Sequence, residues 1–260
     1  MENNEYVRYE VENRVAYITL DRPEKRNAFN AGLVTEMRQA FITAEAADDV
    51  KVIVLRANGK AFCAGADLAY LKKLQKFDLE QNLQDSMHLK DLFEMIYRLT
   101  KPVIAQVEGH AIAGGAGLVT VCDFAFSVPT AKFGYTEVRI GFIPAIVMTF
   151  LLRKCGELRA KELLLTGDII DAEKAVRYNM INDVVPAEEI ADKVKAFAEN
   201  LCKQNSAQSM MITKKMIADI QTFPVREALT FAAKWNAKAR ATEDCRKGIA
   251  AFLNKEPLEW

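Results

Sequence analysis

The chain has 260 residues, of which 50% are hydrophobic and 27% are charged, the composition of an ordinary globular protein. Lys plus Arg and Asp plus Glu both number 35, which excludes a net field that would recruit nucleic acid or an anionic membrane. The longest apolar run, residues 141–152, is shorter than the roughly 20 residues that span a bilayer, so we expect no membrane segment.

The first half of the chain alternates strand and helix patterns. Residues 6–11 and 15–20 alternate apolar and polar positions around a short turn, which predicts a hairpin. Asn30 is the predicted N-cap of a helix that ends near residue 47. The further predicted elements are a strand at 50–55, helices at 67–76 and 79–99, a strand at 103–107, a helix through 118–122 and a strand at 124–127. This order predicts the α/β class.

The second half reads as mostly helical, because Ala, Lys, Glu and Met are frequent and turn signals are few. The predicted helices cover residues 145–155, 158–166, 172–179, 188–203, 206–220, 225–241 and 242–254.

The five cysteines are scattered, odd in number and without a C-x-x-C pair, which is typical of reduced thiols. The chain starts with a polar segment that lacks the pattern of a signal peptide. These features predict a cytoplasmic location.

Two glycine-rich turns each follow a strand and lead into a helix. They are KAFCAGADL at residues 60–68 and GHAIAGGAGL at 109–118. Small residues let another molecule approach the backbone, and helix N-termini offer free N–H groups. Two such turns aimed at one point form an oxyanion hole for a carbonyl that gains negative charge. The alternative is that both are tight structural turns, whereas the G-x-G-x-x-G spacing of a dinucleotide-binding turn is absent.

Other kinds of site find less support. His88 and His110 have no partners at metal-ligand spacing, so we expect no metal site. Ser, Cys and His form no recognisable nucleophile set, and Cys63 is interpreted as a packed thiol.

Several ordered motifs resemble one family over essentially the whole chain. They are ITLDRPEKRNAFN, KAFCAGADL, KPVIAQVEGHAIAGGAGLVTVCD, AKFGYTEVRIGFIP and ELLLTGDIIDAEKAVRYNMINDVV. This set resembles the crotonase, or enoyl-CoA hydratase/isomerase, family, whose members bind acyl-CoA thioesters. The resemblance implies a spiral of ββα units at residues 1–200 that carries the acyl-CoA site. It also implies a helical region at 201–260 through which the chain forms a homotrimer or a dimer of trimers.

The resemblance also implies roles for individual residues. The backbone N–H groups of Ala66 and Gly114 would hold the thioester oxyanion. Glu137, in FGYTE, matches the second of two glutamates that share the acid–base work of typical hydratases, and Gly117 stands in the place of the first. Local physics does not explain this glycine, which costs a helix about 1 kcal/mol relative to alanine. A lone Glu137 is compatible with hydration of a 2-enoyl thioester and with isomerisation of a 3-enoyl thioester, and we expect its pKa to be raised.

The same resemblance implies which residues contact coenzyme A. Because coenzyme A enters as part of the substrate, no separate cofactor is expected. Lys25 or Arg26 would approach its phosphates, and Asp67 is expected to cap the next helix. The backbone near Ala64, Ala66 and Leu68 would hold the adenine, and Phe252 and Lys255 would reach the coenzyme of a neighbouring subunit, although Phe252 fits a core position equally well.

The longer context resembles the subgroup of 3-methylglutaconyl-CoA hydratases of leucine breakdown. The distal carboxylate of that substrate would need a cation, for which Arg139 and Arg153 are candidates, unless they are solvated or structural arginines. The chain could also be a polyketide-pathway dehydratase, a decarboxylase, or a weakly active acyl-CoA or RNA-binding member. The retained Glu137 and the balanced charge argue against the last of these.

Overall fold

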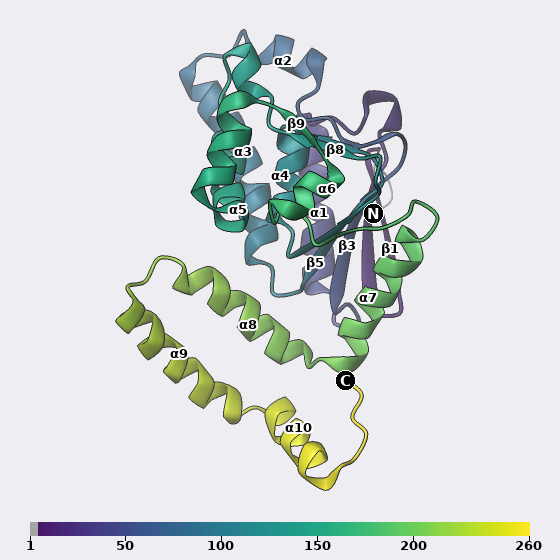
Figure 1. The fold of residues 1–260 in the computed structure, drawn as a ribbon, viewed down its shortest axis with the longest axis vertical. Helices are drawn as coiled ribbons and strands as arrows, with labels where there is room; N and C mark the ends of the chain where they lie inside the picture. The colour runs from purple at the N-terminus through teal and green to yellow at the C-terminus, as the bar shows by residue number, and fades with distance from the viewer. Residues whose placement is uncertain (1–4) are drawn as a thin grey trace.

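The computed structural model describes residues 5–260 and is built on two β-sheets (Figure 1). Residues 1–4, part of the polar start that supports the cytoplasmic expectation, lie outside the described residues. The six-stranded sheet has the order β1 (Val7–Glu12), β2 (Val15–Leu20), β3 (Val52–Ala57), β5 (Val103–Val107), β7 (Phe124–Ser127) and β10 (Asp183–Val184). The four-stranded sheet has the order β4 (Ala61–Cys63), β6 (His110–Ile112), β8 (Lys132–Gly134) and β9 (Ile169–Asp171). Strands β1 and β9 pair antiparallel with their neighbours, and the other pairs are parallel.

Three successive strand pairs place one strand in each sheet and then continue into helix. In the pairs β3–β4, β5–β6 and β7–β8, the first strand joins the six-stranded sheet and the second joins the four-stranded sheet. The helices that follow are α2 (Leu68–Leu74) with α3 (Leu79–Arg98), then α4 (Gly114–Val121), then the 3-10 turn η2 (Glu137–Ile140) with α5 (Ala145–Thr166). The expected spiral of ββα units is therefore confirmed.

The six-stranded sheet owes its burial to the helices that cover it. Every residue of β2 is buried, because the strand lies between β1 and β3 and contacts both α1 (Ala31–Ala46) and α7 (Ile190–Gln204). Helix α1 begins where predicted, since the Asn30 side chain accepts a hydrogen bond from the Leu33 N–H at 2.8 Å. Upstream lies a short 3-10 turn, η1 (Pro23–Lys25).

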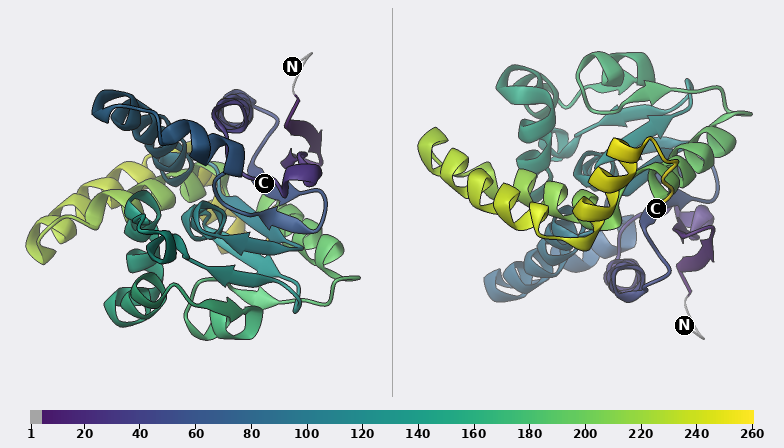
Figure 2. Two further views of the ribbon diagram at one scale, coloured as in Figure 1. Left: turned by 90° about the horizontal axis from the view of Figure 1, so that it is seen from above. Right: turned by 90° about the horizontal axis from the view of Figure 1, so that it is seen from below.

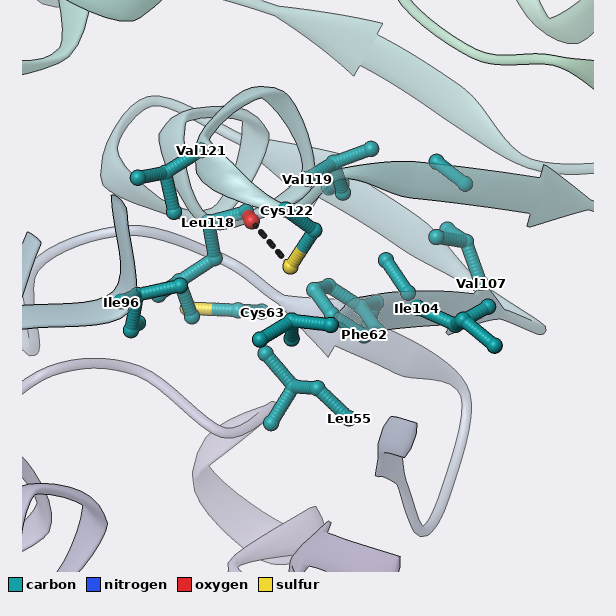
Figure 3. Close-up of a cluster of buried hydrophobic side chains, with 14 of the residues drawn as sticks. Leu55, Phe62, Cys63, Ile96, Ile104, Val107, Leu118, Val119, Val121 and Cys122 are labelled. Atoms are coloured by element: carbon teal, nitrogen blue, oxygen red, sulfur yellow. Dashed lines mark hydrogen bonds between the residues drawn. The ribbon is translucent and has the colours of Figure 1, made fainter. Parts of the chain in front are cut away.

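Helix α4 contributes side chains to a buried apolar cluster of the core (Figure 3). All its residues from Gly115 to Val121 are buried, as expected for a helix that is apolar on every side. Leu118 and Val121 lie with Phe62, Ile96 and other apolar side chains in the same cluster. The glycine-rich start of α4 is thus attached to a helix that packs within the buried core.

The structure departs from the sequence prediction mainly in its short elements. The sequence did not indicate β4, β6, β8, β9 or β10, because strands of two or three residues are too short for an alternating pattern. The predicted helices at 145–155 and 158–166 are two segments of α5 that meet at a kink, where Gly156 has φ 71° and ψ 170°. Helix α6 (Ala172–Arg177) ends two residues earlier than predicted.

The last three helices form an arm that extends away from the sheets (Figures 1 and 2). It comprises α8 (Ala207–Ile220), α9 (Val225–Arg240) and α10 (Glu243–Asn254). Every residue of α8 and α9 is exposed or half-buried. The Lys214 Nζ anchors α8 by donating to the Asp123 carboxylate at 2.7 Å and to the Lys101 carbonyl at 2.9 Å. The predicted division at residue 200 falls inside α7, which ends at Gln204.

Candidate active site

The two glycine-rich turns lie against each other. They contain β4 and β6, which are parallel neighbours in the four-stranded sheet, so the glycines that follow the two strands lie at one edge. A Cβ on Gly65, whose φ is +83°, would lie 2.8 Å from the Ala113 Cβ and 3.7 Å from the Gly114 nitrogen. Gly65 is therefore required both by its backbone conformation and by the close approach of the second turn.

The N–H groups of Ala66 and Gly114 are available to a ligand. Neither donates a hydrogen bond to another residue within 5–260, whereas the neighbouring Asp67 N–H donates to the Phe29 carbonyl at 2.9 Å. Gly114 opens α4, where the helix dipole favours negative charge. The preceding Ala113 has φ 54° and ψ −123°, a conformation that costs about 1–3 kcal/mol in a non-glycine residue. The turn thus holds strain next to a free backbone donor.

Two further glycines explain how closely α4 approaches its neighbours. A Cβ on Gly115 would lie 2.1 Å from the Cys63 carbonyl oxygen, so only glycine lets the helix pack on β4. A Cβ on Gly114 would lie 2.9 Å from Cε2 of Phe29. Cys63 is fully buried, which raises the pKa of its thiol to about 12, in agreement with a packed thiol.

Glu137 supplies a carboxylate with an unsatisfied oxygen. It begins η2, which two residues separate from β8, and its side chain is half-buried. Its Oε2 is buried and has no hydrogen-bond partner among residues 5–260. Burial raises the pKa of this carboxyl group, as expected from the sequence, although a backbone hydrogen bond opposes the shift. A buried carboxylate that keeps one oxygen free suits a group that accepts and returns a proton.

Gly117 is explained by side chains that occupy the space next to it. A Cβ at this position would lie 2.2 Å from Cγ1 of Val147 and 3.1 Å from Cε1 of Phe93. Val147, on α5, and Phe93, on α3, are both buried. Neither contact was predictable from the sequence, because the two side chains come from helices that are distant along the chain.

Four of the residues predicted to contact coenzyme A lie close together. The Ala64 N–H donates to the Arg26 carbonyl at 3.1 Å, which joins the η1 loop to the first glycine-rich turn. Lys25, Arg26 and Leu68 are exposed, and Ala64 is half-buried. Asp67 caps α2 as expected and accepts a hydrogen bond from Arg22 at 2.7 Å. The ion pair between Arg22 and Asp67 was not anticipated.

Phe252 and Lys255 lie far from those four residues within one chain. They belong to the end of α10 and to the residue after it, while α2 is at the opposite end of the long axis (Figure 1). Phe252 is 83% exposed in the single chain, so it occupies no core position there.

The two candidate arginines have protein partners. Arg139 is exposed, and its guanidinium donates to the Asp168 carboxylate at 3.0 Å. Arg153 lies over the Tyr97 ring at 5.8 Å and donates to the Gln221 side chain. Arg153 also lines a cavity of about 770 Å³ between α8 and the far end of α4, at Thr120–Val121 rather than at the glycine-rich start. Arg139 is thus paired with a carboxylate, whereas the partners of Arg153 are a neutral amide and an aromatic ring, so each would have to exchange a contact to bind a substrate carboxylate.

Residues 5–260 contain no group of three or more His, Cys, Asp or Glu side chains that could hold a metal ion. In the same part of the chain, no helix is both long enough and apolar enough to cross a bilayer.

Comparison with known proteins agrees with this geometry. The family described as enoyl-CoA hydratase/isomerase matches residues 10–260. A Thermus thermophilus protein to which enoyl-CoA hydratase activity has been ascribed is 39% identical over 243 residues, covering 94% of this chain and 96% of the relative. The crotonyl-CoA hydratase of Syntrophomonas wolfei is 32% identical, covering 95% of this chain and 94% of the relative. The (E)-benzylidenesuccinyl-CoA hydratase of Thauera aromatica is 30% identical, with 95% of each chain covered.

A solved structure supports the same family. The crystal structure of an enoyl-CoA hydratase from Shewanella pealeana matches with a TM-score of 0.94 and 31% identity, covering 100% of this chain and 97% of that one. Both the sequence match over nearly the whole length and the fold thus lead to one conclusion. The chain belongs to the enoyl-CoA hydratase/isomerase family, as its motifs indicated.

Proposed function

We propose that this protein is an enoyl-CoA hydratase that adds water across the 2,3 double bond of a 2-enoyl-CoA thioester, with Glu137 as its acid–base carboxylate. The observation that carries the proposal is the buried, unpartnered Oε2 of Glu137 in a chain whose residues 5–260 also present two free N–H groups at converging turns. The names of the relatives support the same reaction.

The chemistry follows from these groups. The Glu137 carboxylate takes a proton from water while the water oxygen bonds to C3 of the substrate, and the π electrons move to the thioester oxygen. The N–H groups of Ala66 and Gly114 stabilise this enolate, each donor contributing about 3–4 kcal/mol to the transition state. The protonated Glu137 then returns its proton to C2, which regenerates the carboxylate and yields a 3-hydroxyacyl-CoA.

We propose that coenzyme A binds at the exposed side of the first glycine-rich turn, residues 60–68. Lys25 and Arg26 would meet the phosphates, and the backbone at Ala64, Ala66 and Leu68 would meet the adenine. Support comes from the hydrogen bond that joins Arg26 to Ala64 and from the exposure of these residues.

The arm is the proposed association region, and residues 1–200 form the proposed catalytic core. Support for association comes from apolar side chains that α9 and α10 expose, among them Leu229, Ile249 and Leu253. A homotrimer or a dimer of trimers would cover them and bring Phe252 and Lys255 of one subunit to the coenzyme of another. A cytoplasmic location and the absence of a further cofactor remain predictions.

The acyl group we propose to test first is 3-methylglutaconyl, in the context of leucine breakdown. A carboxylated acyl substrate is also named for the relative from Thauera aromatica. Either Arg139 or Arg153 would supply the cation by giving up its present contact.

The experiment is a product assay in D₂O with crotonyl-CoA, 3-methylglutaconyl-CoA and a 3-enoyl-CoA, read by mass spectrometry beside Glu137→Gln. Water added to a 2-enoyl-CoA, and lost in the variant, is the expected result. A shifted double bond without added water would overturn the hydratase proposal in favour of an isomerase. That second candidate is favoured by the single carboxylate, since a proton shuttle between C2 and C4 needs only one base.

A further inference from the structure

We propose that Val147, supported by Phe93, is a specificity-determining residue that walls the acyl site at Gly117 and thereby leaves Glu137 as the only carboxylate among residues 5–260 within reach of the reacting carbons. The proposal rests on the function proposed above and assigns a role to a residue on α5 that carries no ionisable group.

The position of the wall follows from helix geometry. Gly114 and Gly117 are three residues apart on α4 and therefore share a face of the helix. Gly114 would hold the carbonyl oxygen, so the next turn of the same face is the part of α4 nearest to the carbons beyond the carbonyl. Gly117 has no side chain to offer there, and Val147 fills the space, with its Cγ1 and Cβ at 2.2 Å and 2.8 Å from where a Cβ would be.

Val147 and Phe93 are held in place by the side chains packed around them. Val147 is 4% exposed, and the Phe93 ring stacks on Phe150 at 6.0 Å between centroids with an interplanar angle of 23°. Phe93 also packs against Phe29 at 6.5 Å, and Phe29 is the residue that limits space at Gly114. Because these rings form one packed row, Val147 and Phe93 have little room to move aside for a larger residue at 117.

The chemical consequence is an asymmetric site. A valine methyl group neither accepts nor donates a proton, so the side chains at Gly117 and Val147 give a bound water no hydrogen-bond acceptor. Any water that attacks C3 must then be held and deprotonated by Glu137 alone, whose Oε2 has no partner among residues 5–260.

The first test concerns space and needs no substrate. We would measure melting temperatures of Gly117→Ala, Val147→Gly and the double variant. Glycine is chosen at 147 because the valine Cβ itself lies 2.8 Å from the added atom. Gly117→Ala is expected to lower Tm by roughly 5 °C, as overpacking does, and Val147→Gly to lower it by leaving a cavity. The double variant should be at least as stable as Val147→Gly, whereas additive losses would overturn the proposed wall.

The second test concerns proton transfer. Gly117→Glu combined with Val147→Gly places a carboxylate at the wall, and Gly117→Gln with Val147→Gly is the matched neutral control. The glutamate variant is expected to show a second ionisation in the pH profile of kcat/KM and at least a tenfold higher ratio of hydration to isomerisation than the glutamine variant. Equal profiles and product ratios for the two folded proteins would overturn the role of Val147.

Failure of the Val147 proposal and failure of the hydratase proposal would give different results. If the glutamate variant does not fold, the melting temperatures of Gly117→Ala, Val147→Gly and their double variant still decide whether Val147 fills the space beside Gly117. If the wild-type protein hydrates none of the 2-enoyl-CoA substrates while the thermal cycle shows coupling, the hydratase proposal fails and the packing at Gly117 stands.

Discussion

Glu137 combines two properties at the scale of a single residue, burial and an oxygen without a partner among residues 5–260. Burial raises the pKa of its carboxyl group, so the folded protein binds this proton more tightly than the unfolded chain does. The contribution of Glu137 to stability therefore falls as the pH rises from the ordinary glutamate pKa through the raised value. A carboxyl group that weakens the fold at neutral pH fits the proposed acid–base role.

We predict that Glu137→Gln raises the melting temperature at pH 7 and abolishes turnover. The neutral amide avoids the burial of a charge, and it cannot accept the proton from water. The stabilisation should shrink as the pH is lowered towards about 4.3, the ordinary pKa of glutamate. Thermal unfolding of both proteins across this range checks the sign, and a Tm difference that stays constant with pH would contradict the assigned cause.

The pH dependence of catalysis is a separate prediction. The base must be ionised, so kcat/KM of the wild-type protein should fall on the acid side around a pKa above the ordinary glutamate value. The measurement is a pH–rate profile with crotonyl-CoA, combined with a check that the protein stays folded. An acid limb at or below about 4.3 would mean that another group carries the ionisation.

At the scale of elements, the pair of Arg22 and Asp67 holds the first turn in place. Burial alone would raise the pKa of Asp67, but hydrogen bonds from Arg22 and from the N–H groups of Ala69 and Tyr70 lower it. The resulting stability is present above the ordinary pKa of aspartate and is lost as the pH falls through the lowered value.

We predict that Asp67→Ala destabilises the fold by about 2 kcal/mol or more at pH 7, because it removes a helix cap and leaves the largely buried Arg22 guanidinium with only the exposed Glu24 carboxylate, at 3.9 Å, as an ionic partner. Asp78→Ala is the matched control, since Asp78 caps α3 from an exposed position and should cost only about 1 kcal/mol. Urea unfolding of the three proteins gives the comparison. Equal losses for the two variants would show that the ion pair adds nothing beyond the cap.

The elements also show how far the sequence alone could predict the structure. The long strands and the amphipathic helices were recognisable by their periods, and Asn30 and Asp67 cap the helices they were expected to cap. The short strands of the second sheet carry too few residues for a pattern, so the sheet that aligns both glycine-rich turns was not predicted. Motifs identified Glu137, whereas the reason for Gly117 was inaccessible, because Val147 and Phe93 approach it from distant segments.

At the scale of the whole molecule, the arm exposes apolar side chains to solvent in the single chain. Leu229 is 66% exposed on α9, and Leu253 is 71% exposed on α10. Apolar surface of this kind usually marks an association surface. The anchors at Lys214 and at Trp260, whose N–H donates to the Lys203 carbonyl at 3.0 Å, fix both ends of the arm while its middle extends outward.

We predict that the protein sediments at three or six times its chain mass of 29.2 kDa and that Leu229→Glu with Leu253→Glu shifts it towards the mass of one chain. Burying two added carboxylates without partners costs several kcal/mol, enough to dissociate a moderate interface. Ile42→Glu is the control, because Ile42 is an exposed apolar residue on α1, in the body of the molecule.

Sedimentation velocity and circular dichroism together test whether the arm forms the interface. The variant with both arm substitutions should keep its helical signal, while the mass of the sedimenting particle falls. Activity gives an independent reading, because Phe252 and Lys255 are expected to reach the coenzyme site only from a neighbouring subunit. The KM for acyl-CoA should therefore rise in the dissociated variant more than in Ile42→Glu. An assembly that survives the arm substitutions would place the interface on the body of the protein, and the arm would then need another partner for its apolar face.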